Sequence, residues 1–246
     1  MRSVRTKKAT SKIAASTSAS STERAIDVDG ERLARDFYAR DALVLAKALL
    51  GTYLVVRTPH DKRDDALSPL PPGHAGHVRV VRIVETEAYR GPKDLASHAR
   101  AGLTKRTRTL LGPHGHAYVY LIYGMYDCFN VVCFGEGTGH AVLVRAGEPV
   151  LGIASDIRTD GPGRLARALG LTRAHDAVDL VESNSVYLLP RSKRPKVGVS
   201  ARVGVAYAGE IAEAPWRFFD AESRFVSRPP AKSIGLGLRK DDGRSD

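Results

Sequence analysis

Cysteine is scarce in this sequence of 246 residues, where only Cys128 and Cys133 occur. Two cysteines cannot build the disulfide framework of a small secreted protein. Because they stand an odd number of positions apart in a strand-like run, we expect them on opposite faces of a sheet. Such sparse use of cysteine suits a reducing compartment. We expect both side chains to be buried as small apolar groups.

Long apolar runs are also missing. A membrane-spanning helix needs roughly 18 apolar residues, and Asp127 and Lys47 interrupt the two longest candidates. Acidic residues are few, with 27 Asp and Glu against 38 Lys and Arg, which gives a net charge of +11. This excess favours an anionic partner, nucleic acid first and a membrane surface second. Hydrophobic residues at 43% and charged residues at 26% exclude a wholly disordered chain, a collagen and a coiled coil.

Composition divides the chain into three parts. Residues 1–25 are rich in Ser, Thr, Ala and basic residues and predict a disordered basic tail. This tail fits an arm that adds DNA affinity, an organelle transit peptide or a dispensable solvated segment equally well. Residues 26–227 are expected to form one domain, in which 58–77 is a long surface loop, and residues 228–246 a polar C-terminal tail.

Periodicity predicts a mixed set of short elements within the domain. Asp41 is a plausible N-cap for a helix over 42–50, and Gly161-Pro162-Gly163 opens a second helix over 164–169. A third, short helix is possible at 94–100. Strands are predicted at 52–57, 78–89, 118–123, 128–134, 141–146, 185–189 and 201–205, with a hairpin turn at 124–127. Since helices and strands do not alternate, we expect an α+β domain with a mainly antiparallel sheet.

Two carboxylates and a tyrosine share one face of the strand 78–89. The period of two places Glu85, Glu87 and Tyr89 together and turns Val84, Thr86 and Ala88 the other way. One carboxylate could act as a general base on a water molecule, or the pair could serve a sugar hydrolase. The pattern alone equally fits an exposed edge strand with solvated acids.

Tyrosines are concentrated in the predicted hairpin. Tyr118 and Tyr120 share a face, while Tyr123 lies next to the glycine-led turn and can project from the tip. A flat amphipathic ring there suits a wedge between stacked bases. The alternative is ordinary core packing, because aromatic residues favour strands.

Six basic residues and three glycines are interspersed along 90–112, which suits close approach to phosphates, although such loops are often only solvated. The helix that opens at Gly161 is a second possible phosphate site. The pairs His74/His77 and His114/His116 lie in loops without further ligands at zinc spacing, so we expect no metal site. The sequence also has no phosphate-binding loop and no dinucleotide fingerprint.

Taken together, these stretches resemble the alkyladenine (3-methyladenine) DNA glycosylases of the vertebrate and bacterial alkylpurine type. The matching segments keep the family's order and extend over about residues 31–225. They are RIVETEAYRGPKDLASH (82–98), GHAYVYLIYGMYDCFNVV (115–132), VLVRA (142–146), GPGRL (161–165) and ARVGV (201–205).

The resemblance implies a monofunctional glycosylase built on a single mixed domain, with a curved, mainly antiparallel sheet and a protruding β-hairpin, and with no metal and no cofactor. It places Glu87 as the general base that aims a water at C1′ of a flipped nucleotide. Further roles carried over are these: Arg145 helps hold the water, Tyr89, His98 and Tyr120 surround the base, Asn130 forms the pocket floor that disfavours guanine, and Tyr123, Met125 and Arg106 contact DNA.

The implied substrate is double-stranded DNA with damaged purines, namely 3-alkyladenine and 7-alkylguanine, with hypoxanthine and ethenoadenine as further candidates. Extruding a nucleotide costs a few kcal/mol of stacking and pairing, and least for damaged bases. We expect a monomer that needs no membrane, located in the cytoplasm or nucleoid of a bacterium, or in the nucleus or an organelle of a eukaryote. A non-catalytic nucleic-acid-binding module and the Glu85/Glu87 carbohydrate hydrolase remain the alternatives.

Overall fold

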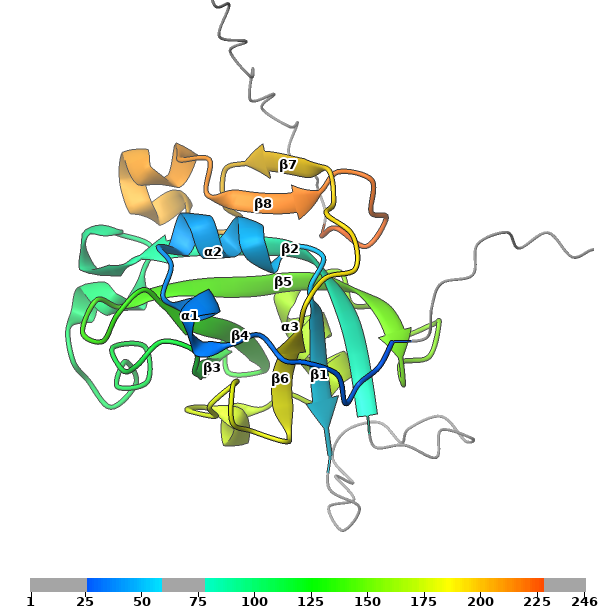
Figure 1. Cartoon of the computed structure of the whole chain (residues 1–246). Coiled ribbons are helices and arrows are strands. Elements are labelled where there is room, and N and C mark those ends of the chain that lie inside the picture. Colours follow the sequence, from blue (N-terminus) through cyan, green and yellow to red (C-terminus); the bar gives the residue numbers. More distant parts are fainter. Residues whose placement is uncertain (1–25, 59–77, 228–246) are drawn as a thin grey trace, which may run out of the picture.

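The computed structural model describes residues 26–58 and 78–227 (Figure 1). The two predicted tails and nearly all of the predicted surface loop, residues 59–77, lie outside this part. The strands are β1 (Tyr53–Arg57), β2 (Val78–Arg90), β3 (Ala117–Ile122), β4 (Tyr126–Cys133), β5 (His140–Leu151), β6 (Val186–Leu189), β7 (Val197–Ser200) and β8 (Arg217–Asp220). The α-helices are α1 (Arg35–Tyr38), α2 (Ala42–Leu49) and α3 (Pro162–Leu169), and short 3₁₀ helices cover Gly91–Lys93, His98–Ala101, Arg173–His175 and Ala206–Glu213.

The described strands form one antiparallel sheet in the order β3-β4-β5-β2-β1-β6, and β8 joins β2 to β7. The long strand β2 is its centre, because it pairs with β1, β5 and β8. The sheet curls, with the β7–β8 pair and α2 on one side of the β2–β5 ribbon in the view of Figure 1. This arrangement confirms the α+β domain with an antiparallel sheet. No helix among the described residues is long and apolar enough to cross a membrane.

The helix α2 forms as predicted and ends one residue earlier. The Asp41 side chain accepts a hydrogen bond from the Leu43 amide and so caps the first turn. Leu45, Ala46 and Leu49 are fully buried on its inner face. The Thr86 hydroxyl on β2 donates to the Ala46 carbonyl at 2.8 Å. This contact fixes one face of β2 toward the helix and leaves the other face for polar side chains.

Alternation along β3, β4 and β5 separates a core face from a polar, aromatic face. Both cysteines are buried without a disulfide, Cys133 in the main core and Cys128 on the opposite face, as their spacing predicted. The core face carries Val119, Phe129, Val131, Val142 and Val144. The opposite face carries Tyr118, Tyr120, Cys128, Asn130, Leu143 and Arg145.

The hairpin between β3 and β4 is tighter than predicted. Residues 123–125 separate the paired ends Ile122 and Tyr126. Tyr123 and Gly124 both have positive φ (53° and 71°), and the Met125 amide donates to the Ile122 carbonyl. Two positive φ angles define the turn type that matches the twist of a hairpin, for which Asn-Gly is the favoured pair. Tyrosine in this conformation costs about 1–2 kcal/mol. The hairpin therefore holds Tyr123 at its tip at the expense of stability.

Two predicted elements are wrong. Residues 201–205 form a loop instead of a strand, because Gly204 takes a left-handed conformation (φ 76°) and the chain then enters a 3₁₀ helix. No α-helix spans 94–100. There the Asp94 carboxylate accepts hydrogen bonds from the Arg90 and Ala96 amides, which offers the backbone an alternative to helical bonding. The sequence pattern also missed β7 and β8.

Candidate active site

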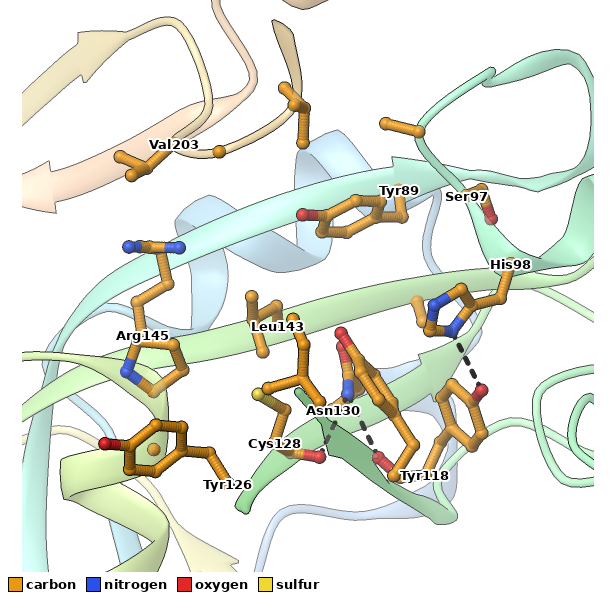
Figure 2. Close-up of a pocket in the computed structure, with 18 of the residues that line it drawn as sticks. Tyr89, Ser97, His98, Tyr118, Tyr126, Cys128, Asn130, Leu143, Arg145 and Val203 are labelled. Carbon is orange, nitrogen blue, oxygen red and sulfur yellow. Dashed lines mark hydrogen bonds between the residues drawn. The ribbon is translucent and has the colours of Figure 1, made fainter. Parts of the chain in front are cut away.

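A cavity of about 470 Å³ opens on the aromatic face of the sheet (Figure 2). Strands β2 to β5 form its floor and back, and its rim comes from the loops at 96–98 and 203–207 and from the start of α3. Most of its lining side chains are apolar or aromatic, and Arg145 and Arg164 are its charged members. Size and composition fit a pocket for a small organic group held by a few polar contacts.

Two β-bulges aim the charged side chains at this cavity. Ile83 pairs with Gly147 and Glu85 with Ala146, so Val84 is an extra residue in β2. Thr86 then pairs with Val144, so Arg145 is an extra residue in β5. Bulges commonly redirect side chains beside active sites. Here the double irregularity brings Arg145 against two carboxylates of β2.

Glu87 is fully buried and its carboxylate contacts three residues that line the cavity. Its Oε1 accepts a hydrogen bond from the Val203 amide at 2.7 Å and lies 3.3 Å from a terminal nitrogen of Arg145. Its Oε2 accepts from the Tyr89 hydroxyl at 3.0 Å. Burial, followed by the Glu87 charge, raises the pKa of Tyr89 well above its ordinary value, so the hydroxyl keeps its proton and donates it.

Glu85 is also fully buried but its contacts are of a different kind. Its Oε1 accepts hydrogen bonds from Arg145 at 2.9 Å, from Arg217 at 2.7 Å and from the Ser227 hydroxyl at 2.7 Å. Its Oε2 accepts from the Ser227 amide at 2.6 Å. A carboxylate bound in this way cannot serve as the acid of a sugar hydrolase, and neither acid lies on a solvated edge strand. Both of those alternatives are therefore disfavoured.

Arg145 links the two carboxylates. Burial acts to lower its pKa, but the charges of Glu87 and Glu85 outweigh that effect and raise the pKa. Together with Arg217 the cluster contains two cations and two anions, so its charges balance. The balance matters because an unpaired charge at this depth costs several kcal/mol.

His98 and Tyr118 lie at the other end of the cavity, away from Arg145 (Figure 2), and Tyr120 contacts both rings. The centroid of Tyr120 lies 4.5 Å from that of His98 and 5.2 Å from that of Tyr118. The His98 Nδ1 is 3.0 Å from the Tyr118 hydroxyl, and its Nε2 is 3.5 Å from a terminal nitrogen of Arg106. Because arginine only donates, Nε2 is the acceptor and Nδ1 carries the proton.

The electrostatics of this cluster keep it uncharged. Burial, followed by the Arg106 charge, lowers the pKa of His98 to about 4. Burial raises the pKa of Tyr118 to about 12 and raises that of Tyr120 further. At neutral pH the rings are therefore neutral and electron-rich, which suits a flat, electron-poor ligand that packs against this cluster.

The floor is closed by Asn130 and Cys128. The Asn130 amide nitrogen donates to the backbone carbonyls of Tyr118 at 3.1 Å and Cys128 at 3.3 Å (Figure 2). These two bonds fix the amide orientation and leave its oxygen as the group that can meet a ligand. Burial raises the pKa of Cys128 to about 11, so it stays an uncharged thiol.

The residues predicted to contact DNA lie at the rim and beyond it. Tyr123 and Met125 are among the most exposed large apolar side chains, at 82% and 67%, on the hairpin tip. Arg106 is exposed, and its guanidinium lies 5.3 Å from the centroid of Tyr120. The hairpin tip and the loop that carries Arg106 thus belong to one open surface around the cavity mouth.

Sequence reasoning missed several members of the site. The Val203 amide carries no side-chain signal, and Arg217 and Ser227 follow an irregular stretch that gave no motif. Alternation predicts that Tyr118 shares a strand face with Tyr120, but it gives no sign of the contact between Tyr118 and His98. Among residues 26–58 and 78–227, no group of three or more His, Cys, Asp and Glu side chains is arranged to hold a metal ion.

Comparison with known proteins identifies relatives over most of the chain. Residues 72–224 match the model of the methylpurine-DNA glycosylase family. A protein of Myxococcus xanthus named "Putative 3-methyladenine DNA glycosylase" is 50% identical over 200 residues, which is 80% of this chain and 94% of that protein. A protein of the same name from Methanocella arvoryzae is 44% identical over 207 residues, 80% of this chain and 96% of that protein.

Proposed function

This chain belongs to the methylpurine-DNA glycosylase family, and on that premise we propose that it removes damaged purines from double-stranded DNA. The expected substrates are 3-alkyladenine and 7-alkylguanine, together with hypoxanthine and ethenoadenine. The observation that carries the proposal is the joint placement of Glu87, Arg145 and Tyr89 at the edge of an aromatic cavity.

The reaction is hydrolysis of the N-glycosidic bond of a nucleotide turned out of the duplex. Glu87 accepts a proton from a water molecule as the water oxygen bonds to C1′. The bond from C1′ to the base nitrogen breaks, and its electron pair leaves with the base. A purine alkylated at N3 or N7 is cationic and leaves as a neutral base, and the product is an abasic site in an uncut strand.

The surroundings of Glu87 support its role as the base. The Val203 amide donates to the carboxylate and a terminal nitrogen of Arg145 lies beside it, and both contacts fix the orientation of the carboxylate. The water must enter between the carboxylate and the cavity, where the Tyr89 hydroxyl and Arg145 now bind. A small movement of either side chain opens that place once a nucleotide has entered.

The aromatic end of the cavity supports recognition of a purine. Tyr89, His98 and Tyr120 present ring surfaces, and neutral tyrosine rings attract a cationic base by about 0.5–2 kcal/mol each. The Asn130 oxygen meets the edge of the base, where the 2-amino group of guanine would crowd the floor. Selection thus combines easier extrusion of damaged bases with a fit that disfavours guanine. The base 7-alkylguanine has the same 2-amino group and is released because its positive charge makes it the better leaving group.

The hairpin supports the step that turns the nucleotide out. Tyr123 is held at the tip in a strained conformation and has few contacts, so its ring is available to fill the gap left in the duplex. Arg106 and the basic loop around it supply the phosphate contacts. The net charge of +11 agrees with a polyanionic substrate.

The test is release of free base from synthetic duplexes that each carry one of the four lesions. We expect release from at least one of them, no release from an undamaged duplex, and strand cleavage only after alkaline treatment of the abasic site. Binding without release from any lesion would instead identify a nucleic-acid-binding module.

A further inference from the structure

Arg202 is a buried arginine to which the reaction above gives no task. It belongs to the segment ARVGV (201–205), and its side chain is fully buried. The guanidinium carbon lies 4.7 Å from the ring centroid of Tyr89 and 4.8 Å from that of Trp216. The cation therefore packs between two aromatic rings and occupies one face of Tyr89, which leaves the other face for a ligand.

Asp94 is the partner of Arg202 and is equally buried. The pair is bidentate, with Arg202 terminal nitrogens donating to Asp94 Oδ2 at 2.6 Å and Oδ1 at 2.9 Å. Arg202 also donates to the Ala88 carbonyl of β2 at 3.0 Å. Its Nε has no hydrogen-bond acceptor within the described part of the chain, so the two terminal nitrogens alone hold the group.

Asp94 extends this contact into the loop that forms one wall of the cavity. Its carboxylate oxygens accept from the Arg90 amide at 3.1 Å and from the Ala96 amide at 3.0 Å. Ala96, Ser97 and His98 follow directly and line the cavity. The position of His98 thus depends on a turn that is bonded to the Asp94–Arg202 pair.

On its other side, Arg202 directly precedes Val203, whose backbone amide binds Glu87, the proposed general base. Val203 donates its amide to Glu87 at 2.7 Å, and Val203 and Gly204 line the cavity. A displacement of Arg202 by a fraction of its length would move this amide away from the carboxylate. The same pair therefore controls Tyr89, the loop 94–98 and the contact of Val203 with Glu87.

We propose that the Arg202–Asp94 ion pair fixes the positions of two parts of the site relative to each other. These are the purine-binding wall, formed by Tyr89 and the loop 94–98, and the Glu87 carboxylate. The inference rests on the proposed glycosylase function and adds two positioning residues to it. Arginine is required because a planar guanidinium combines two parallel hydrogen bonds with stacking on both rings, and lysine offers neither. Misplacement of catalytic groups by about 1 Å costs about a hundredfold in rate.

The main experiment is single-turnover base release by Arg202→Met, which keeps the aliphatic stem between the rings and removes the charge and the donors. The substrate is the lesion duplex that the wild type processes fastest, at rising protein concentration. We expect the maximal rate to fall at least about tenfold, with the half-saturating concentration changed less than about threefold. Arg202→Lys should restore only part of the rate.

The matched control is Arg82→Met, which breaks a less buried arginine pair with Asp220 in the same sheet, outside the cavity. If Arg202→Met loses no more rate than Arg82→Met, the proposal is overturned. If Arg202→Met does not fold, the double variant Asp94→Asn/Arg202→Met, which leaves neither charge buried alone, is judged by the same criterion.

A second readout needs no substrate. Trp216 is the only tryptophan in the chain, so its fluorescence reports the packing of Arg202 directly. In folded Arg202→Met we expect an emission maximum shifted to longer wavelength, because looser packing exposes Trp216 to water. An unchanged spectrum would overturn the positioning role of the Arg202–Asp94 pair. Absence of base release by the wild type itself would refute the proposed function, while this spectroscopic test of the ion pair would still stand.

Discussion

The Val203 amide nitrogen lies 2.7 Å from Oε1 of Glu87, although the two residues are 116 positions apart in the sequence. The bond joins the loop after β7 to the central strand β2. It means that the orientation of a strand carboxylate is set by backbone from another part of the fold, and not by strand geometry alone.

Glu87→Gln should bind lesion-containing duplex as the wild type does and release base at least about a hundredfold more slowly, because the amide cannot accept the proton of the attacking water. Anisotropy of a labelled duplex measures binding, and quantified free base measures release. Turnover close to that of the wild type would remove Glu87 from the role of base.

Tyr123→Asn should bind and process duplex DNA less well while making the fold more stable, by up to about 1–2 kcal/mol, since Asn-Gly is the preferred pair in this turn. Denaturant unfolding and duplex binding are measured on the same preparation. Tyr123→Phe, which keeps the flat ring, is the control and should bind as the wild type does. Equal binding by the Asn variant would show that the hairpin tip is not the wedge.

His98 should make the fold less stable in acid. The unfolded chain takes up this proton near the ordinary pKa of 6.5, and the folded protein only near 4, so its contribution to stability is lost as the pH falls from about 6.5 to about 4. The difference in unfolding free energy between wild type and His98→Asn should therefore shrink between pH 7.5 and pH 5. Parallel profiles would contradict the lowered pKa. Arg106→Gln should raise the lower limit of this pH window and leave its upper limit unchanged.

Glu85→Gln should destabilise the protein by about 3–5 kcal/mol, because it leaves Arg145 and Arg217 short of a buried counter-charge. The control is Glu148→Gln on β5, whose carboxylate pairs with Arg82 at a 37% exposed position and should cost no more than about 1 kcal/mol. Urea unfolding measures both. Similar small losses would mean that the buried cluster contributes little to the fold.

Arg106→Gln should reduce the salt dependence of duplex binding by one phosphate contact, a change of about 0.9 in the log–log slope. The matched control is Arg57→Gln. Arg57 lies on the strand β1, away from the cavity, and forms an ion pair with Asp29. Its slope should equal that of the wild type. An unchanged slope for Arg106→Gln would place the DNA backbone elsewhere.

The regular parts of the fold follow from periodicity because apolar side chains on one face of each element alternate with polar or aromatic side chains on the other. The helix α2 has a capping aspartate and an apolar stripe, and β2 to β5 alternate between core and cavity. The prediction failed where side chains override the pattern. Arg217 in β8 is fully buried, although a charged residue normally indicates an exposed position.

The candidate site was accessible from sequence only where side chains form a motif. Glu85, Glu87 and Tyr89 share a strand face, as alternation predicts. The β-bulge at Val84 was not predictable, because no sequence pattern indicates it. Val203 and Arg202 came from a segment interpreted as a strand. Their contribution depends on contacts between distant segments, with Glu87 and Asp94, which local periodicity does not encode.

The bond between Ser227 and Glu85 sets an order of events during synthesis. Glu85 emerges early from the ribosome, but both Ser227 donors arrive 142 residues later. Arg145 and Arg217 also contact Ser227, so the buried charge cluster is complete only when nearly the whole domain has been translated.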